Sequence, residues 1–304
     1  MGPPPAMPEA PKSVCVMDAS GYLGSRLVHH LLRRGYNVHA AVNNGGELEF
    51  LQRLAGEDNK CLKLYSCDPL DYQSIVDAIK GCCGLFYSFE PPKYQTAYDD
   101  LMMEVEVRAA HNVLEACGQT ESMEKVVFTS SVAAVIWKEN RKSMAEFDER
   151  HWSEANFCRN FKLWYALSKT LAEKTAWALA MDRGVNMVSV NSGLLTGPDL
   201  GAAHPYLKGA AEMYEDGVLV TVDVDYLVDA HIGAFEKEST FGRHICFNRL
   251  INREEDAVEL ARLLAPSATY LPNSSKDSKM YEQRISNKKL NKIMVDFTGG
   301  IRDE

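Results

Sequence analysis

The stretch SVCVMDASGYLGSRLVHHLLRRG, residues 13–35, decides the predicted fold of this chain of 304 residues. Residues 13–17 form a short apolar run that is typical of a buried β-strand, and residues 27–35 have the apolar spacing of an α-helix. Between these segments lies a turn that contains Gly21 and Gly24. A strand, a glycine-containing turn and a helix, in this order, are typical of the first unit of a doubly wound sheet.

Strands and helices alternate from this unit as far as Asn191. The further strands that we expect cover residues 38–42, 61–68, 84–88, 125–131 and 185–191. The further helices that we expect cover residues 71–80, 97–117 and 161–183. Because apolar strands followed by amphipathic helices pack as a parallel sheet with helices on both faces, we expect a Rossmann-type α/β fold.

The alternation breaks down after Asn191. Loops rich in Gly and Pro follow, with one strand-like piece at residues 218–222 and one helix at residues 254–264. We interpret this part as a smaller C-terminal lobe that covers a substrate. The organisation that we expect is a disordered Pro-rich tail at 1–12, a nucleotide-binding Rossmann domain at 13–191 and mainly a substrate-binding lobe at 192–304.

The composition is that of an ordinary soluble globular protein, with 46% hydrophobic and 25% charged residues. The formal net charge is −9 and no block of Lys and Arg occurs, which argues against a nucleic acid or a membrane surface as partner. No apolar run is long enough to span a membrane, and the N-terminus lacks the apolar core of a signal peptide. Eight cysteines without CxxC spacing indicate free thiols in a reducing compartment, so we expect a cytoplasmic protein. The eight histidines form no ligand cluster, and we expect no metal.

Three polar residues are candidates for a catalytic set. Tyr165 and Lys169 are four residues apart on an expected helix, so they share one face and the ammonium lies near the phenol. A nearby positive charge lowers the pKa of a tyrosine, which is about 10 in isolation, and lets the side chain exchange a proton near neutral pH. Ser131 ends an expected strand, where its hydroxyl can hold a carbonyl oxygen on which charge develops. Together these residues favour the reduction of a carbonyl group.

The turn before the first helix is an incomplete dinucleotide fingerprint. Gly21 and Gly24 occupy the second and third glycine positions of the pattern, but Asp18 stands in the first. A carboxylate in that position repels a pyrophosphate, and the position often needs a conformation that Gly adopts most easily. Alternatively, Asp18 caps the following helix.

The ends of the second and third strands hold two further candidate contacts to a nucleotide. A dinucleotide site selects its cofactor at the second strand, with an acid for the ribose hydroxyls or an Arg for the 2′-phosphate. Asn43 occupies this place and serves neither purpose strongly. Asp68, at the end of the third strand, either accepts from an adenine amino group or is a turn residue before Pro69.

With this fold and these motifs, the chain resembles the extended short-chain dehydrogenases/reductases, and among them the plant group of cinnamoyl-CoA reductases and dihydroflavonol reductases. The similarity runs from Val14 to Asn291. It is carried by ASGYLG at 19–24, RRGYNV at 33–38, NVLEAC at 112–117, VVFTSS at 126–131 and the pairs WY and SK within 164–169.

The resemblance implies an NADPH-dependent enzyme, with NADP as cofactor, that reduces a carbonyl or thioester on a phenylpropanoid-type small molecule. It implies that Ser131 orients the carbonyl, that Tyr165 donates the proton, and that Lys169 holds the nicotinamide ribose and lowers the pKa of the tyrosine. It also implies residues that contact the pyrophosphate and the adenine, which are Gly21, Tyr22, Leu23, Gly24 and Asp68. Relatives with this architecture occur as monomers and as homodimers, and the sequence does not decide between them.

Four positions that would face the cofactor depart from the family pattern: Asp18 replaces a Gly, Asn43 replaces an Arg, and Phe89 and Glu90 replace small residues. We therefore expect a weakened or altered NADP site. The segment 163–169 also differs from that of the true cinnamoyl-CoA reductases, which leaves the acceptance of CoA thioesters open. The alternative is a non-catalytic relative that keeps the fold and acts as a binding or regulatory protein.

The substrate pocket is expected between the loop after the fourth strand, residues 132–160 and the lobe after residue 192. Large apolar residues in these segments are candidates for its lining, although packing in the core is their more frequent fate. The candidates are Trp137, Trp152, Phe157, Met213 and Tyr214.

Overall fold

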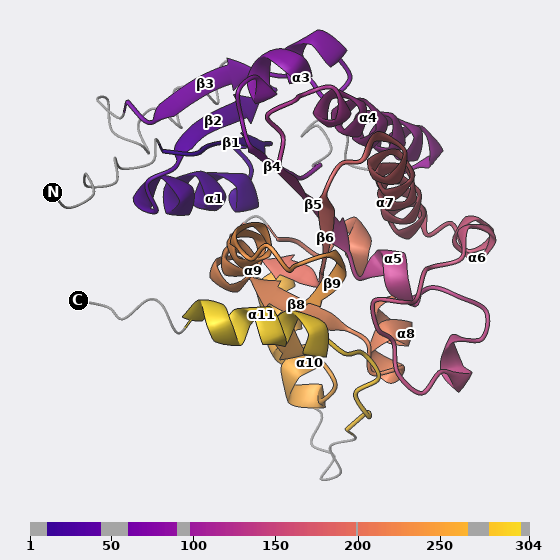
Figure 1. The fold of residues 1–304 in the computed structure, drawn as a ribbon. Helices are drawn as coiled ribbons and strands as arrows, with labels where there is room; N and C mark the ends of the chain where they lie inside the picture. The colour runs from indigo at the N-terminus through magenta and orange to yellow at the C-terminus, as the bar shows by residue number, and fades with distance from the viewer. Residues whose placement is uncertain (1–10, 44–59, 90–97, 199, 267–279, 299–304) are drawn as a thin grey trace, which may run out of the picture.

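The computed structural model describes residues 11–43, 60–89, 98–198, 200–266 and 280–298. Its centre is a parallel sheet of seven strands in the order β3-β2-β1-β4-β5-β6-β9 (Figure 1). These strands are β1 (Ser13–Met17), β2 (Asn37–Val42), β3 (Leu62–Ser66), β4 (Gly84–Tyr87), β5 (Lys125–Ser131), β6 (Met187–Ser192) and β9 (Gly242–Cys246). The strand order reverses between β1 and β4, and doubly wound folds bind their ligands outside the carboxyl ends of the strands at such a reversal. The Rossmann-type fold expected from the sequence is confirmed.

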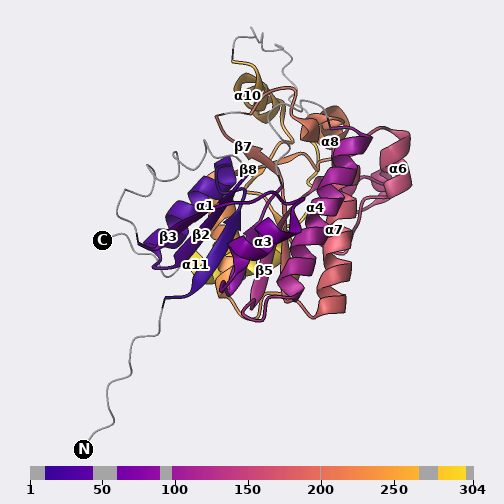
Figure 2. The same cartoon turned by 90° about the horizontal axis from the view of Figure 1, so that it is seen from above.

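Two layers of helices cover the sheet, one on each face (Figures 1 and 2). One layer consists of α1 (Tyr22–Arg33), α9 (Val224–Glu236) and α11 (Lys288–Thr298). The other layer consists of α3 (Tyr72–Ile79), α4 (Asp100–Gly118) and α7 (Trp164–Arg183). Within the second layer α4 and α7 pack along their length, so a residue on α4 can contact a residue on α7.

A second, smaller sheet lies beyond the carboxyl ends of the central strands. Its strands are β10 (Arg249–Leu250), β8 (Val220–Asp223) and β7 (Leu194–Thr196), in that order. The short helices are α5 (Ala133–Ile136), α6 (Ala155–Asn160), α8 (Ala210–Glu215) and α10 (Glu254–Leu264), with the 3-10 turns η1 (Arg141–Ser143) and η2 (Pro205–Leu207). Their apolar side chains share one hydrophobic cluster with the start of α7. This cluster is the body of the smaller lobe.

The chain after Asn191 contributes to both sheets, which the sequence pattern does not predict. Helix α9 and strand β9 continue the alternation, and β9 pairs with β6 at the edge of the central sheet. The pattern is obscured because β9 buries polar residues: Arg243 is 7% exposed and His244 is 2% exposed. The division at 191/192 stays a prediction, and residues 1–10 of the expected tail lie outside the described residues.

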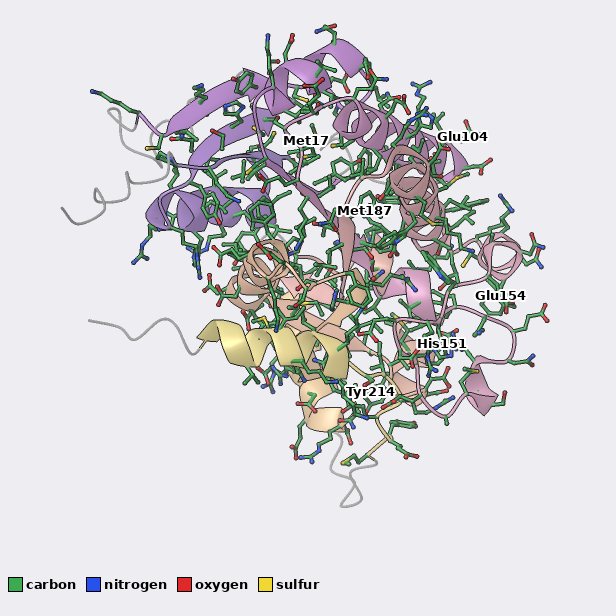
Figure 3. All side chains as sticks on the ribbon, viewed as in Figure 1. Met17, Glu104, His151, Glu154, Met187 and Tyr214 are labelled. Atoms are coloured by element: carbon green, nitrogen blue, oxygen red, sulfur yellow. The ribbon has the colours of Figure 1, made fainter. Side chains whose placement is uncertain are left out.

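Strand β1 shows why these residues form a sheet that is covered on both faces. Val14 and Val16 belong to the cluster under α1 and α9, whereas Cys15 and Met17 belong to the cluster under α3 and α4. Successive side chains of a strand point to opposite faces, so an unbroken apolar run is needed where both faces are buried. Figure 3 shows the side chains that fill the space between the sheet and its helices, with Met17 labelled.

The close contact between β1 and α1 leads to a prediction for Gly24. A Cβ atom at this position would lie 2.0 Å from the carbonyl oxygen of Asp18, and this backbone atom cannot move without shifting β1. Gly24→Ala is therefore expected to lower the free energy of unfolding by about 3 kcal/mol or more. Chemical denaturation measures this loss.

Gly201→Ala is the matched control, because a Cβ atom there would meet nothing within 4 Å. This substitution is expected to change the free energy of unfolding by less than about 0.5 kcal/mol. Equal losses in the two variants would contradict the close approach of β1 and α1.

Candidate active site

Helix α7, which carries the predicted tyrosine and lysine, is held on the sheet by one buried carboxylate. Glu173 accepts hydrogen bonds from Ser130 Oγ at 2.8 Å, Ser189 Oγ at 2.6 Å and Asn191 Nδ2 at 2.7 Å. The Nε atom of Arg243 lies 2.8 Å from Glu173 Oε1 and pairs with its charge. The four partners belong to β5, β6 and β9, so a single side chain ties α7 to three strands.

Tyr165 and Lys169 precede Glu173 at intervals of four residues, so all three lie on one face of α7. Lys169 Nζ lies 5.5 Å from the centre of the Tyr165 ring. It also donates a hydrogen bond of 3.3 Å to the carbonyl of Phe89, just after β4. The structure thus brings the tyrosine and the lysine together near the carboxyl end of β4.

Glu106 of α4 belongs to the same group and is not among the residues predicted from the sequence. Glu106 Oε1 lies 2.6 Å from Lys169 Nζ. Glu106 Oε2 accepts hydrogen bonds from Tyr98 OH at 2.8 Å and from Ser168 Oγ. Burial, followed by the charge of Glu106, raises the pKa of Tyr98 well above its usual value, so Tyr98 stays a hydrogen-bond donor. The sequence signal for Glu106 is an acid on the buried face of α4, where a charge requires a partner.

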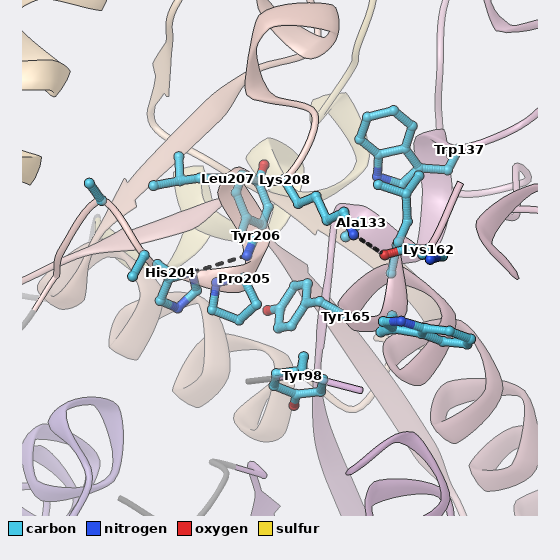
Figure 4. A pocket seen from close by; sticks show the side chains of 15 residues that line it. Tyr98, Ala133, Trp137, Lys162, Tyr165, His204, Pro205, Tyr206, Leu207 and Lys208 are labelled. Atoms are coloured by element: carbon cyan, nitrogen blue, oxygen red, sulfur yellow. Dashed lines mark hydrogen bonds between the residues drawn. The ribbon is translucent and has the colours of Figure 1, made fainter. Parts of the chain in front are cut away.

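A cavity of about 320 Å³ opens beside Tyr165 (Figure 4). The ring centres of Tyr98 and Tyr206 lie 5.1 Å and 6.3 Å from that of Tyr165. At the rim, Lys208 Nζ donates a hydrogen bond to the carbonyl of Lys162. The residues that line the cavity are Tyr98, Ala133, Trp137, Lys162, Leu163, Trp164, Tyr165, Ala166, Ala202, Ala203, His204, Pro205, Tyr206, Leu207 and Lys208.

Of the five large apolar residues proposed for the lining, only Trp137 is among the residues that line this cavity. Trp152 packs under the guanidinium of the buried Arg243, whose Cζ atom lies 3.6 Å from the centre of the indole ring. Phe157 stacks on the indole of Trp137, with ring centres 6.5 Å apart. Met213 is fully buried in the core of the smaller lobe, and Tyr214 packs on another tyrosine. These four residues serve packing, which the sequence pattern alone does not distinguish from lining a pocket.

His204 stands in the cavity wall, with its ring centre 6.0 Å from that of Tyr165. Its Nδ1 atom accepts a hydrogen bond of 3.3 Å from the backbone N–H of Tyr206 and so caps η2. Burial, followed by the charge of Lys169, lowers the pKa of His204 to about 4. Near neutral pH the imidazole is therefore neutral, and its proton is on Nε2 because Nδ1 is an acceptor.

Ser131 is the last residue of β5 and is 1% exposed. Its Oγ atom accepts a hydrogen bond of 3.1 Å from the N–H of Ala133 and donates one of 3.5 Å to the carbonyl of Ser192. Ala133 lines the cavity, so the Ser131 hydroxyl is bonded to the backbone of a residue in the cavity wall, whereas Ser131 is not itself among the lining residues. The structure places Ser131 at the same end of the sheet as the tyrosine, with its hydroxyl bonded to the backbone.

The glycine turn after β1 has the geometry of an anion site, except for Asp18. Gly21 is the N-cap of α1, and the helix begins at Tyr22, so the first backbone N–H groups of α1 point out of its N-terminus at this turn. Asp18 has a φ angle of 60°, the left-handed conformation that Gly adopts most easily. A Cβ atom on Gly21 would lie 2.5 Å from Asp18 Oδ2. Asp18 is therefore not the cap of α1, and its carboxylate lies against the turn.

A second cavity, of about 50 Å³, adjoins this turn outside the carboxyl ends of β1, β2 and β4. Asp18, Asn43 and Phe89 are among its lining residues. Three of the four positions that depart from the family pattern thus surround one space. The fourth, Glu90, lies outside the described residues.

Asp68 is exposed beside this second cavity, and two residues that flank it, Cys67 and Pro69, contribute to the lining. Its Oδ1 atom accepts a hydrogen bond of 2.8 Å from the N–H of Leu70. This bond is the one expected of a turn residue before a proline. A contact between Asp68 and an adenine stays a prediction.

The cysteines, the potential metal ligands and the helices of the described residues bear on three further kinds of feature: disulfides, metal clusters and membrane-spanning helices. All eight cysteines are free thiols, and burial raises the pKa of the Cys67 thiol to about 11. No group of three or more His, Cys, Asp and Glu among the described residues could hold a metal ion. Within the same ranges, no helix has the length and apolar character needed to cross a membrane.

A tyrosine and a lysine on one helix face, beside a cavity at the carboxyl edge of a doubly wound sheet, define the class of short-chain dehydrogenases/reductases. A sequence model of the NAD dependent epimerase/dehydratase family matches residues 14–218. Cinnamoyl-CoA reductase 2 of Arabidopsis thaliana is 37% identical in an alignment of length 278 that covers 88% of this chain and 82% of the relative. Cinnamoyl-CoA reductase 1 of Petunia hybrida is 35% identical in an alignment of length 300 that covers 94% of this chain and 87% of the relative.

Among solved structures, vestitone reductase from alfalfa (Medicago sativa) aligns with a TM-score of 0.71 and 27% identity, over 94% of this chain and 93% of that chain. The chain belongs to the NAD dependent epimerase/dehydratase family, within the extended short-chain dehydrogenases/reductases that include the cinnamoyl-CoA reductases. The resemblance inferred from the motifs and the assignment to an oxidoreductase family are thereby confirmed.

The lowered pKa of His204 predicts a loss of stability in acid. As the pH falls below the ordinary value of 6.5, the unfolded chain takes up a proton on His204, whereas the folded chain does so only near pH 4. The unfolded state therefore binds more protons in this window, and the folded state loses stability as the pH falls. Thermal unfolding between these pH values should show a falling Tm.

His204→Asn is the matched variant, because Asn Oδ1 can accept the same hydrogen bond from Tyr206 but does not titrate. The fall of Tm between pH 6.5 and pH 4 should be smaller in this variant. Parallel curves for the two proteins would show that His204 is not the group that takes up the proton.

Proposed function

We propose that this chain is an NADPH-dependent reductase of a carbonyl or thioester on a phenylpropanoid-type substrate, with a weakened NADP site. The observation that carries this proposal is the pair Tyr165 and Lys169, with Nζ 5.5 Å from the ring centre, at the edge of a cavity. The relatives named as cinnamoyl-CoA reductases support the substrate class.

The cavity suits a small aromatic substrate. Its volume of about 320 Å³ falls in the range of small-molecule sites. Tyr98, Trp137 and Tyr206 offer aromatic surface against which a substrate ring can pack. The neutral imidazole of His204 adds one hydrogen-bond donor near the tyrosine, which suits a hydroxyl or carbonyl oxygen.

The residues of the site divide the reaction among them. Bound NADPH would supply a hydride to the carbonyl carbon. Tyr165 then gives its hydroxyl proton to the carbonyl oxygen, so that the C=O group becomes an alcohol. The Lys169 ammonium stabilises the phenolate that remains, and Ser131 orients the carbonyl oxygen once its hydroxyl rotates away from Ser192. A thioester undergoes the same hydride addition and then loses its thiol, which yields an aldehyde.

The turn of residues 21–24 would hold the pyrophosphate of the cofactor at the N-terminus of α1, and Asp68 would contact the adenine. Asp18 places a carboxylate against this turn, and Asn43 offers no charge to a 2′-phosphate. A lost charged hydrogen bond costs about 1.5–3 kcal/mol, which is roughly ten- to a hundredfold in affinity. We therefore expect NADPH to bind, but weakly.

Replacement of Tyr165 tests the proton donor. Tyr165→Phe should lower turnover by at least about a hundredfold, because the carbonyl oxygen no longer receives a proton, while the dissociation constant for NADPH changes by less than about twofold. Tyr214→Phe is the control, since Tyr214 packs on Tyr281 and does not line the cavity, and it should keep its turnover. Retained turnover in Tyr165→Phe would exclude Tyr165 as the proton donor.

Replacement of Asp18 tests the obstacle at the nucleotide turn. Asp18→Gly should tighten NADPH binding at least about tenfold in calorimetric titration, because it removes a carboxylate next to the pyrophosphate and leaves a residue suited to a φ angle of 60°. Asp18→Asn separates charge from size, and most of the gain should appear in this variant as well. An unchanged dissociation constant in both variants would show that the turn accommodates Asp18.

The same titration decides on the alternative, a non-catalytic protein with a binding or regulatory role. The observation in its favour is the carboxylate of Asp18 at the turn. If millimolar NADPH and NADH release no heat on titration and give no protection against thermal unfolding, the non-catalytic alternative becomes the better description. Binding of NADPH in preference to NADH would support the reductase.

A further inference from the structure

The carboxylate of Glu106 is fully engaged at the site. One oxygen lies 2.6 Å from the Lys169 ammonium, and the other accepts from the hydroxyls of Tyr98 and Ser168. Both oxygens act only as acceptors, which is the pattern of an ionised carboxylate. The side chains of Glu106 and Lys169 are 3% and 9% exposed, so water screens this pair only weakly.

The position of this negative charge affects Tyr165 through Lys169. The lysine contributes a positive charge 5.5 Å from the Tyr165 ring, and a positive charge there favours the phenolate. A carboxylate at ion-pair distance from the same ammonium offsets part of that field. Tyr98 links the two groups a second time, because it donates to Glu106 and packs edge-on against the Tyr165 ring at 5.1 Å.

We propose that Glu106 is a positioning residue that fixes the Lys169 ammonium beside Tyr165 and, by offsetting its charge, keeps the Tyr165 hydroxyl protonated. The pH range of reduction follows from this. Reduction of a carbonyl needs the phenol as proton donor, whereas oxidation of an alcohol needs the phenolate as base. Glu106 therefore keeps the free enzyme in the form that starts reduction and extends that form to higher pH, while the overall equilibrium is unchanged. The inference about the pH range rests on the proposed function.

The ionisable groups that face this site come from several elements. Tyr98 precedes α4, Glu106 lies on α4, and Lys169 lies on α7 beside Tyr165. Four further groups lie in the cavity wall: His204 and Tyr206 from the segment at η2, and the lysines Lys162 and Lys208. Tyr87, at the end of β4, faces Glu106, and burial raises the pKa of its hydroxyl well above the usual value. Burial lowers the pKa of His204 to about 4 and raises that of Tyr206 well above its usual value, so both are neutral between these limits. Among the described residues, Glu106 is the carboxylate at ion-pair distance from Lys169.

The experiment measures the ionisation of Tyr165 without substrate or cofactor. Ultraviolet difference titration follows the tyrosinate signal, and subtraction of the matching Tyr165→Phe protein in each background isolates Tyr165. Glu106→Gln keeps the shape of the side chain and removes its charge, so the pH at which Tyr165 loses its proton should fall by about one unit. Glu106→Asp retains the charge and should keep the midpoint close to that of the unchanged chain.

Glu104→Gln is the matched control, because Glu104 lies on the same helix but is exposed (Figure 3). This substitution removes the same charge from a position in solvent, where screening is strong, so the pH midpoint of Tyr165 should stay unchanged. Equal midpoints in Glu106→Gln and the unchanged chain would overturn the proposal, as would an equal shift in Glu104→Gln.

Turnover measurements separate this inference from the proposed function. A fall in the pH midpoint of Tyr165 ionisation in Glu106→Gln supports the role of Glu106, whether or not a carbonyl substrate is reduced. A lack of reduction would contradict the proposed reductase and not the role of Glu106. If the protein is active, the alkaline limb of the pH–rate profile for reduction should move to lower pH in Glu106→Gln, by the same amount as the Tyr165 midpoint. An unmoved limb would overturn the inference about the pH range of reduction and leave the reductase intact.

Discussion

The placement of the site depends on the buried charge of Glu173. An unpaired carboxylate in the interior is costly, so α7 can dock only where Arg243 and the polar groups of β5 and β6 meet it. Arg243 is itself fixed, because its guanidinium packs on Trp152 and donates to backbone carbonyls of the segment before α6. The reacting groups of the first two thirds of the chain are therefore aligned by a strand from the last third.

Most of the central fold could be predicted from the sequence, because most of its strands are apolar runs buried on both faces and its helices are amphipathic. The exceptions follow Asn191 and are the helices α9 and α11 and the strand β9. The buried side chains of β9 include Arg243 and His244, so the run does not look apolar, and the partner that neutralises Arg243 lies far away in the sequence on α7. A buried strand with polar side chains can be recognised only when the residues that neutralise or hydrogen-bond those side chains are known from the structure.

The same distinction applies to the site. Tyr165 and Lys169 are recognisable because their spacing of four residues on a helix is local information. Glu106 is visible in the sequence only as an acid on the buried face of α4, and His204 lies in an irregular segment without periodicity. Their roles arise from contacts between α4, α7 and η2, which no local pattern encodes. Asp18 is an intermediate case. The sequence predicts that its carboxylate repels a dinucleotide, but only the structure shows that Asp18 adopts the left-handed conformation, with a φ angle of 60°.

The path of the chain between the two sheets has a mechanical consequence. The backbone passes from β6 to β7, returns from β8 to α9, passes again from β9 to β10 and returns once more before α11. A lobe joined by a single linker can rotate about that linker, whereas rotation of a lobe with several connections must be absorbed by all of them at once. Exchange of molecules with the cavity is therefore expected through local movement of its own wall more than through rotation of the whole lobe.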